Sequence, residues 1–414
     1  MGRIINERGS NQPVMNVGML GSVSDGKSTC VRVLTGIKTQ RHSSEQTRNI
    51  TIKPGYANMK VWSNGSSYES TDSRPNNFSK DGEDYELVHH LSFVDCPGHH
   101  ELILTMLGSI KLMNAVIVVV AASEPIEKKP QLIQHLAAVK LSGISNIIVC
   151  LNKIDLVDKE LATSRHQELE RLLQRFELTP KCIIPTSFSK KIGVEWLLEE
   201  IMNHFEPPED NEQAPIFMAT RSFDINKPGV DWDKVSGGVL GGSLFNGTLE
   251  VGDELEIRPG IVDPRNNRCT PIRTKIQSLQ SDQEQLTSIK PGGLIGIGTD
   301  IDSYYCRNDY LSGNIIGKVG DLPSVYNSIE MKYTLTEDFG AKWKAKKNQN
   351  MFLQIGSLSI DSVVSSFNKK TVSFNLSRPA CVSKDSMIII CTKEDGTVKI
   401  VGYGSLKSGN KIID

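Results

Sequence analysis

Residues 21–28 (GSVSDGKS) follow the spacing G-x-x-x-x-G-K-[ST], which is typical of a loop that binds phosphates. The glycines let backbone N–H groups curve around phosphate oxygens, and the ammonium of Lys27 can reach the β and γ oxygens. The hydroxyl of Ser28 can be a ligand of Mg²⁺. An ordinary glycine turn with a lysine by coincidence is the alternative. The residues expected at the phosphates are Ser24, Asp25, Gly26, Lys27, Ser28 and Thr29.

A second motif, D-x-x-G, occupies residues 95–98 and is followed by His99. A carboxylate at the end of a strand can hold a water of a Mg²⁺ ion, so Asp95 is a predicted metal-site residue. Gly98 can offer its N–H to a γ-phosphate that is present in one nucleotide state only. His99 is then expected near the terminal phosphate. Because the motif is short, a turn with a surface histidine remains the alternative.

A third motif, N-K-x-D at residues 152–155, indicates the base. The carboxylate of Asp155 can accept two hydrogen bonds from the N1–H and N2–H₂ edge of guanine, whereas adenine presents an acceptor there. Asn152 can bond the N7 side of the ring and tie back to the phosphate loop, and the stem of Lys153 can pack on the base. Backbone N–H groups near guanine O6 are expected from Ser187, Phe188 and Ser189.

The three motifs occur in a fixed order, each after a strand-like run, and together they predict a GTP-binding switch domain. The expected strands are continuous apolar runs at residues 14–20, 91–95, 115–121, 146–151 and 182–185. Amphipathic helices are expected at residues 101–113, 130–141, 159–176 and 194–205, with a further helix starting at 27–34. This alternation indicates a mainly parallel sheet covered on both faces, which binds ligands at the carboxyl ends of its strands.

Two stretches interrupt this pattern. Residues 63–86 are rich in Ser, Asn, Asp and Gly and predict a surface loop or ribbon, partly flexible. Residues 206–215 form an acidic, proline-containing linker. The short β-like segments after it are separated by Gly, Pro and Asp, which predicts a β-barrel. These segments are residues 216–220, 247–257, 273–279 and 293–298.

Composition limits which partners, which cysteine chemistry and which location the chain can have. The chain has 414 residues, 47 basic and 48 acidic, so any nucleic-acid partner must be held by a local patch. Its eight cysteines include no C-x-x-C pair, which favours buried reduced thiols. The polar start and the lack of a membrane-length apolar run lead us to expect a cytoplasmic protein without membrane association. Lysines around Trp343 at residues 342–347 suit RNA contacts, although a solvated loop explains them equally well.

The chain resembles the translational GTPases typified by elongation factor Tu. Within them it is most similar to the gamma subunits of translation initiation factor 2 of eukaryotes and archaea. The resemblance runs from about residue 16 to the end. It rests on residues 48–53 (RNITIK), 55–58 (GYAN), 221–229 (RSFDINKPG), 237–243 (GGVLGGS), 258–261 (RPGI), 291–299 (PGGLIGIGT) and 355–358 (IGSL).

The resemblance implies an α/β P-loop GTPase domain followed by two β-barrel domains, at residues 1–206, 216–323 and 324–414. It further implies a GTPase that carries methionylated initiator tRNA to the small ribosomal subunit and releases it when GTP is hydrolysed to GDP. The expected partners are the alpha and beta subunits of the same factor, together with GTPase-activating and nucleotide-exchange factors. The implied cofactors are GTP or GDP and Mg²⁺.

The resemblance also assigns roles to single residues. Thr51 would complete Mg²⁺ coordination with Ser28, while Asp95 acts through water. His99 would orient the attacking water, flanked by Val23 and Ile50 as an apolar gate. The candidates for contact with the end of the tRNA are Asn49 and Tyr56.

The chain departs from the family pattern at several positions. Ser22 and Asp25 stand where histidines are usual, and a carboxylate beside a triphosphate is unfavourable unless it faces Mg²⁺ or its waters. Phe188 replaces an alanine, so the packing near the base must differ. The cysteine knuckle of the archaeal relatives is missing, and residues 63–86 take its place. Two alternatives therefore stay open: an assembly scaffold with weak hydrolysis, and an elongator- or selenocysteine-type tRNA carrier.

Overall fold

The structure is a computed structural model that describes residues 12–39, 51, 53–127, 129–227, 229, 231, 235–263, 265–335, 343–394 and 396–413. The chain folds into two compact units, Met1–Pro208 and Glu209–Asp414. All eight cysteines are free thiols, six of them buried, as the sequence predicts. Among the described residues, no helix is both long and apolar enough to cross a membrane.

The first unit is built on a twisted sheet with the strand order β3-β2-β5-β1-β6-β7-β8. Five neighbouring strands run parallel, in the order β5, β1, β6, β7 and β8. At one edge, β2 pairs antiparallel with β5, and β3 pairs antiparallel with β2. Strands β1 and β6 are buried along their whole length, as continuous apolar runs require. The strands are β1 (Met15–Leu20), β2 (Gly55–Ser63), β3 (Tyr68–Asp72), β4 (Phe78–Lys80), β5 (Glu83–Asp95), β6 (Ala115–Ala121), β7 (Asn146–Asn152) and β8 (Cys182–Pro185).

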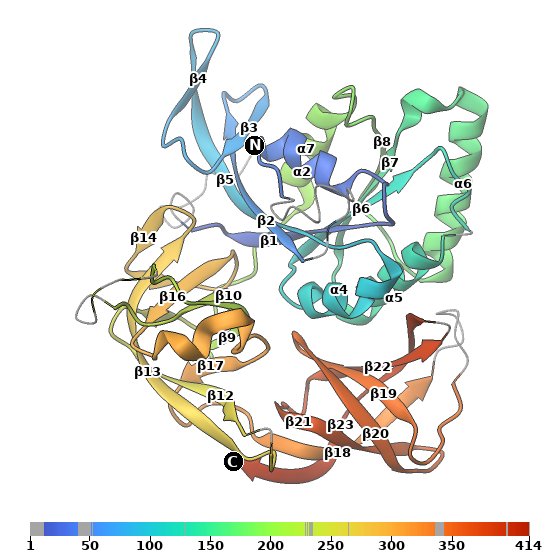
Figure 1. Cartoon of the computed structure of the whole chain (residues 1–414). Coiled ribbons are helices and arrows are strands. Elements are labelled where there is room, and N and C mark those ends of the chain that lie inside the picture. The colour runs from blue at the N-terminus through green and yellow to red at the C-terminus, as the bar shows by residue number, and fades with distance from the viewer. Residues whose placement is uncertain are drawn as a thin grey trace. The chain divides into compact units, whose positions relative to one another are not determined.

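Helices cover both faces of this sheet. Figure 1 shows α2 and α7 on one side and α4 and α5 on the other. The helices are α2 (Lys27–Thr35), α4 (Ile103–Ile110), α5 (Pro130–Ser142), α6 (Lys159–Arg175) and α7 (Val194–His204). Short 3₁₀ turns precede α4 at His100–Leu102 and follow β7 at Ile154–Leu156. The predicted alternation of strands and helices is confirmed, with ends within a few residues except at β5.

Strand β5 is longer than predicted because the polar stretch at residues 63–86 forms a ribbon. Strands β3 and β4 each pair with their neighbours, and β4 forms a hairpin with the start of β5. The ring of Trp62 stacks on Phe78, whose edge meets Tyr85. These three aromatic side chains hold the ribbon together.

The second unit begins with a barrel closed by the pairing of β12 with β13. Around the ring the order is β12-β17-β9-β10-β16-β13, and apolar side chains from alternate positions fill its interior. Its strands are β9 (Ile216–Phe223), β10 (Val239–Asn246), β12 (Glu254–Val262), β13 (Cys269–Ser281), β16 (Ile295–Thr299) and β17 (Ile315–Lys318). Shorter strands lie beside the ring at β11 (Leu249–Glu250), β14 (Glu284–Leu286) and β15 (Ser288–Ile289), and a 3₁₀ segment spans Ser303–Asp309.

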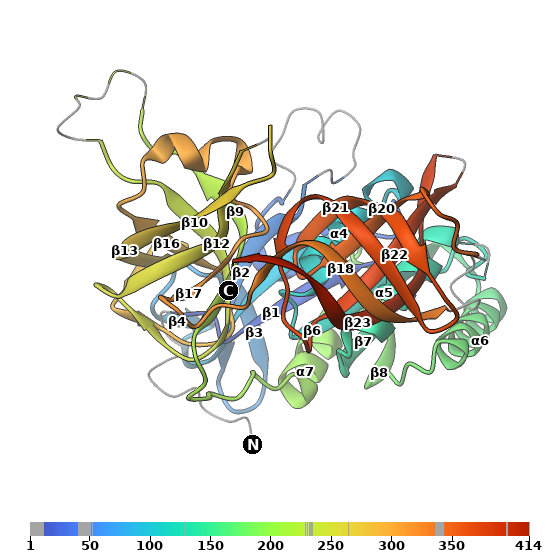
Figure 2. The ribbon, with the colours of Figure 1, turned by 90° about the horizontal axis from the view of Figure 1, so that it is seen from below.

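A second closed barrel follows, with the strand order β18-β21-β20-β19-β22-β23 (Figure 2). Its strands are β18 (Val325–Leu335), β19 (Asn350–Ile355), β20 (Leu358–Phe367), β21 (Thr371–Cys381), β22 (Met387–Glu394) and β23 (Thr397–Ile413). The predicted fold class, a P-loop GTPase domain followed by two β-barrels, is confirmed.

Of the two interpretations of residues 342–347, stacking of Trp343 on RNA does not fit the structure. Trp343 is buried in the apolar core of the barrel, its ring meets Tyr333 edge-on, and its Nε1–H donates to Gln349 Oε1 at 2.9 Å. The ring is therefore not available to stack on RNA, because its large apolar surface is already buried against the barrel core. Lys344, Lys346 and Lys347 are exposed, as expected of a solvated loop.

Candidate nucleotide-binding site

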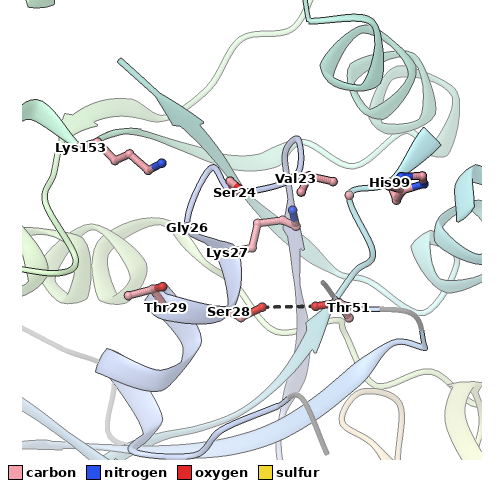
Figure 3. Close-up of a pocket in the computed structure, with 10 residues that line it drawn as sticks. Val23, Ser24, Gly26, Lys27, Ser28, Thr29, Thr51, His99 and Lys153 are labelled. Carbon is pink, nitrogen blue, oxygen red and sulfur yellow. Dashed lines mark hydrogen bonds between the residues drawn. The ribbon is translucent and has the colours of Figure 1, made fainter. Parts of the chain in front are cut away.

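A pocket of about 350 Å³ lies at the carboxyl end of β1, where the predicted motifs meet (Figure 3). In Figure 3, Lys153 and His99 stand on opposite sides of it, with the phosphate loop between them. The pocket is lined by Val23, Ser24, Gly26, Lys27, Ser28, Thr29, Thr51, Gly98, His99 and Lys153. Segments that are far apart in the sequence therefore build one polar cavity, as a parallel sheet predicts.

Glycine is required at Gly26, where the phosphate loop turns into α2. Its φ is 108°, and a Cβ there would lie 2.3 Å from Nδ2 of Asn152. Because α2 begins at the next residue, its first backbone N–H groups and the positive end of its dipole point to the loop. This arrangement suits an anion such as a phosphate.

Lys27 lies at the floor of the pocket, and its Nζ donates to Gly21 O at 2.9 Å and to Ser22 O at 2.7 Å. Burial lowers the pKa of this ammonium, while the charges of Asp95 and Asp25 oppose the shift. The lysine is thus held by carbonyl oxygens of its own loop, within reach of anything that binds there.

The three predicted metal-site residues come together. Ser28 Oγ donates to Asp95 Oδ2 at 2.6 Å and lies 3.3 Å from Thr51 Oγ1. Thr39, which the sequence motifs do not include, donates its hydroxyl to the same carboxylate oxygen at 2.6 Å. Two hydroxyl groups and one carboxylate are hard oxygen donors of the kind that Mg²⁺ prefers, so these residues fit the ion.

The loop after β5 packs directly on the phosphate loop. A Cβ at Gly98 would lie 2.5 Å from Lys27 Nζ and 2.8 Å from Val23 N, so only glycine fits without displacing either group. His99 follows at the pocket wall with its side chain 32% exposed, and its Nδ1 accepts a long hydrogen bond from Glu101 N at 3.4 Å. Val23 lines the same wall, whereas Ile50 lies outside the described residues.

The residues predicted to recognise the base lie at the end of β7 and just after it. Asn152 donates from Nδ2 to Asp25 O at 2.8 Å, which ties the third motif to the phosphate loop, as expected. Lys153 has a left-handed backbone (φ 63°) and lines the pocket. Asp155 is exposed and does not line the phosphate end of the cavity.

The loop after β8 differs in part from the expectation. The N–H of Phe188 donates to Asn152 Oδ1 at 3.1 Å, and the N–H of Ser187 donates to Ile192 O at 3.1 Å. A base oxygen would therefore have to share the Phe188 N–H or take it from Asn152. The Phe188 ring is buried in the core of this unit, which is the altered packing that its size predicts. Ser189 is exposed, and its hydroxyl lies 3.3 Å from that of Ser187.

The side chain of Asp25 does not line the pocket, so the unfavourable contact between its carboxylate and a triphosphate is avoided without a facing Mg²⁺. Its side chain is 1% exposed and forms a 2.6 Å ion pair with Lys129, the residue before α5. The pair satisfies the carboxylate inside the protein, so the charge is not directed at a ligand. No spacing in the sequence identified Lys129, because its partner lies 104 residues away.

A second residue that the motifs missed supports the same loop. His135 on α5 is fully buried, and its Nδ1 accepts from Gly21 N at 2.9 Å. Burial lowers the pKa of this histidine to about 3, with a further lowering by the nearby charge of Lys27. The ring is therefore neutral and acts as a hydrogen-bond acceptor.

Of the two tRNA candidates, only Tyr56 can be placed, and it does not line the pocket. Asn49 lies outside the described residues. Tyr56 is half-buried in β2, where it pairs with Val94 of β5. Its contact with tRNA remains a prediction.

Comparison with known families gives two matches. Residues 12–207 match the Elongation factor Tu GTP binding domain, and residues 327–406 match the C-terminal domain of initiation factor eIF2 gamma. In solved structures, a bacterial selenocysteine-specific elongation factor has a TM-score of 0.72 at 21% identity, with 95% of this chain and 58% of that chain covered. SelB of Methanococcus maripaludis, bound to a GTP analogue, has a TM-score of 0.71 at 20% identity, with 97% and 80% covered. These two likenesses concern the fold alone.

Full-length relatives are more specific. The chain is 39% identical to the eukaryotic translation initiation factor 2 subunit gamma of Encephalitozoon cuniculi, over 97% of this chain and 94% of the relative. It is 36% identical to subunit 3 of the same factor in Drosophila melanogaster, over 97% and 90%. With the subunit gamma of Pyrococcus abyssi it shares 35% identity over 97% and 99%. The chain thus belongs to the gamma subunits of translation initiation factor 2, within the translational GTPases, and is a GTP-binding subunit of an initiation factor.

Proposed function

We propose that this protein, in its GTP form, binds methionylated initiator tRNA, delivers it to the small ribosomal subunit and releases it after hydrolysis of GTP to GDP. The observation that carries the proposal is the contact of Gly98 with the phosphate loop, where a Cβ would lie 2.5 Å from Lys27 Nζ. A loop packed this closely has to respond to a γ-phosphate in the pocket. Differential contact with one phosphate is what a two-state switch requires.

The set formed by Ser28, Thr51 and Asp95 would hold Mg²⁺ beside the phosphates. Bound there, the ion would neutralise the charge on the β and γ oxygens. Thr51 belongs to the segment between α2 and β2, so its hydroxyl beside Ser28 couples that segment to the nucleotide site. The same coupling supports the assignment of residues near Thr51 to the tRNA-binding response.

Hydrolysis is assigned to residues on the pocket wall. Lys27 and the N–H groups at the start of α2 stabilise charge that develops on the phosphate oxygens. His99, on the loop after β5, orients the attacking water and takes part in its deprotonation. Val23 stands beside it as an apolar side chain that limits the access of bulk water. In this scheme Asn152, Lys153 and Asp155 select guanine.

The relatives are named as subunits of translation initiation factor 2, which supports an assembly with other chains. The partners proposed are the alpha and beta subunits, with a GTPase-activating factor that sets the rate of GTP hydrolysis and a nucleotide-exchange factor that sets the rate of GDP release. The boundaries 1–206, 216–323 and 324–414 are kept as the proposed functional domains.

The proposal is tested by tRNA binding at one fixed salt concentration, because salt weakens phosphate contacts. Methionylated initiator tRNA and one elongator aminoacyl-tRNA are each titrated against the full chain with a non-hydrolysable GTP analogue and with GDP. Tight binding of the initiator alone, and only with the GTP analogue, is the expected result. Equal binding of both tRNAs would indicate an elongator-type carrier, and binding that ignores the nucleotide would indicate a scaffold.

A further inference from the structure

A buried ion pair lies beneath the phosphate loop. It joins Asp25, which is 1% exposed, to Lys129, which is 7% exposed, with 2.6 Å between Oδ1 and Nζ. Asp25 is the residue before Gly26 in the loop, and Lys129 stands immediately before α5. The pair thus connects the nucleotide site to an element that does not line the pocket.

Both oxygens of the Asp25 carboxylate are used inside the protein. Oδ1 also accepts from Ala121 N at 3.1 Å, and Oδ2 accepts from Ser22 N at 2.8 Å. The carbonyl oxygen of Asp25 accepts from Asn152 at 2.8 Å. One residue of the loop is therefore fixed to the ends of β6 and β7 and to the start of α5.

The negative charge of Asp25 matters for a phosphate ligand, because both are negative and lie at the same loop. Lys27 is close enough to Asp25 for their charges to interact, and Glu124, which is largely exposed, lies 3.4 Å from the ammonium of Lys129. Without Lys129, the loop that must bind several negative phosphate charges would contain an uncompensated carboxylate. At the dielectric typical of a protein surface, such a charge within about 10 Å of the phosphates weakens binding by about tenfold or more.

We propose that Lys129 is a positioning residue for guanine-nucleotide binding. It holds the Asp25 carboxylate away from the pocket and cancels its charge, so that a phosphate loop with an acidic residue beside Gly26 binds GTP and GDP. The inference rests on the GTP binding of the family and is independent of tRNA delivery, because its test contains no tRNA.

If Lys129 has this role, replacing Lys129 should weaken nucleotide binding more than replacing Asp25. A purely structural ion pair predicts equal losses of affinity. Lys129→Met and Asp25→Asn break the same contact, and each leaves one buried partner uncompensated. Only Lys129→Met leaves a negative charge next to the phosphates. Its loss of affinity should therefore exceed that of Asp25→Asn, and removing the carboxylate as well should restore binding.

The experiment measures the dissociation constants of fluorescent GDP and of a fluorescent non-hydrolysable GTP analogue with the full chain. The variants are Lys129→Met, Lys129→Arg, Asp25→Asn and the double variant Asp25→Asn/Lys129→Met. Lys140→Met is the matched control, because Lys140 lies in α5, the helix that Lys129 precedes, but pairs with Glu177 on the surface. Thermal unfolding of each nucleotide-free variant reports stability separately.

We expect Lys129→Met to bind both nucleotides at least about tenfold more weakly than Asp25→Asn, with the larger loss for the GTP analogue. The double variant should recover most of the lost affinity, and Lys129→Arg, which keeps the charge, should stay close to the wild type. Lys140→Met should not change binding.

Equal losses in Lys129→Met and Asp25→Asn, or a folded double variant that binds as weakly as Lys129→Met, would overturn the proposal in favour of a structural pair. If Lys129→Met does not fold, the double variant and Lys129→Arg decide the question. In that case, a folded double variant that loses about tenfold in affinity would contradict the proposal.

Discussion

At the residue scale, the pocket is built from groups that already have partners inside the protein. The Lys27 ammonium is held by Gly21 and Ser22, and the hydroxyl of Ser28 donates to Asp95. These contacts fix the positions of the polar atoms before a ligand arrives, which reduces the reorganisation that binding requires. His99 and Asp155 are more exposed than these groups, and their roles are tested directly.

His99→Ala is expected to leave GTP binding intact and to slow GTP hydrolysis by about 10²- to 10⁴-fold, the usual loss when a general base or water-orienting group is removed. Phosphate release in a single turnover measures the rate, and binding of a GTP analogue measures affinity. His166→Ala is the control, because His166 is a half-buried histidine of α6 that does not line the pocket. Hydrolysis by His99→Ala at the wild-type rate would remove the catalytic assignment.

Asp155→Asn is expected to reduce the preference for GTP over ATP by about tenfold or more, because the carboxylate would no longer accept two hydrogen bonds from guanine. Competition between the two nucleotides measures the preference. Asp158→Asn is a close control: it removes the same charge three residues away, and asparagine can replace aspartate as the N-cap of α6. An unchanged preference in Asp155→Asn would contradict the proposed base contact.

At the scale of elements, the site depends on the parallel strands. Strands β5 and β1 are neighbours in the sheet, β6 separates β1 from β7, and one of the three motifs lies at the carboxyl end of each of β1, β5 and β7. The helices α2 and α5 then meet at the phosphate loop, α2 through its first turn and α5 through His135. Elements without motif residues, such as α5, therefore support the phosphate loop without lining the pocket.

The burial of Trp343 gives a prediction for the second barrel. Trp343→Ala should lower the free energy of unfolding of this barrel by about 3–5 kcal/mol, because it leaves a large cavity in the core. Urea unfolding of the full chain measures the loss, with Lys346→Ala as an exposed control expected to change stability by less than about 0.5 kcal/mol. Unchanged stability with weakened tRNA binding would instead return Trp343 to the role of an RNA-stacking residue.

At the scale of the whole molecule, the two compact units contain different parts of the protein. The first unit, Met1–Pro208, contains the whole pocket described above, and the second, Glu209–Asp414, contains both barrels. Two buried histidines of the first unit have lowered pKa values. Burial lowers the pKa of His89 to about 4 and is the main reason that the pKa of His135 falls to about 3.

These two histidines predict how stability depends on pH. In the unfolded chain they take up protons below about pH 6.5, whereas in the folded chain they remain neutral until their lowered pKa values are reached. The free energy of unfolding of the first unit should therefore decrease as the pH falls below about 6.5, by about 1.4 kcal/mol per pH unit for each histidine. Urea midpoints at about pH 7 and about pH 5 measure the decrease, and His135→Asn should make it smaller. An identical decrease in the variant would contradict the contribution of His135.

Much of this molecule could be predicted from its sequence. The three motifs, the apolar strands of the first unit and the short Gly- and Pro-bounded strands of the second are local patterns, and local patterns determine secondary structure and the ends of parallel strands. The meeting of Ser28 and Asp95 follows from the same logic, because the loops after the neighbouring strands β1 and β5 share one edge. Thr51 lies between α2 and β2 and is expected beside Ser28 only from the family resemblance.

Only the tertiary structure decided where the side chains of Asp25 and Trp343 point. A carboxylate in a phosphate loop and an aromatic among lysines each predict a ligand contact, yet each side chain is directed into the protein. The partners that decide this, Lys129 for Asp25 and the barrel core for Trp343, are brought close by the fold. Sequence patterns report which groups are present near a site, whereas burial and long-range pairing determine which of them a ligand can reach.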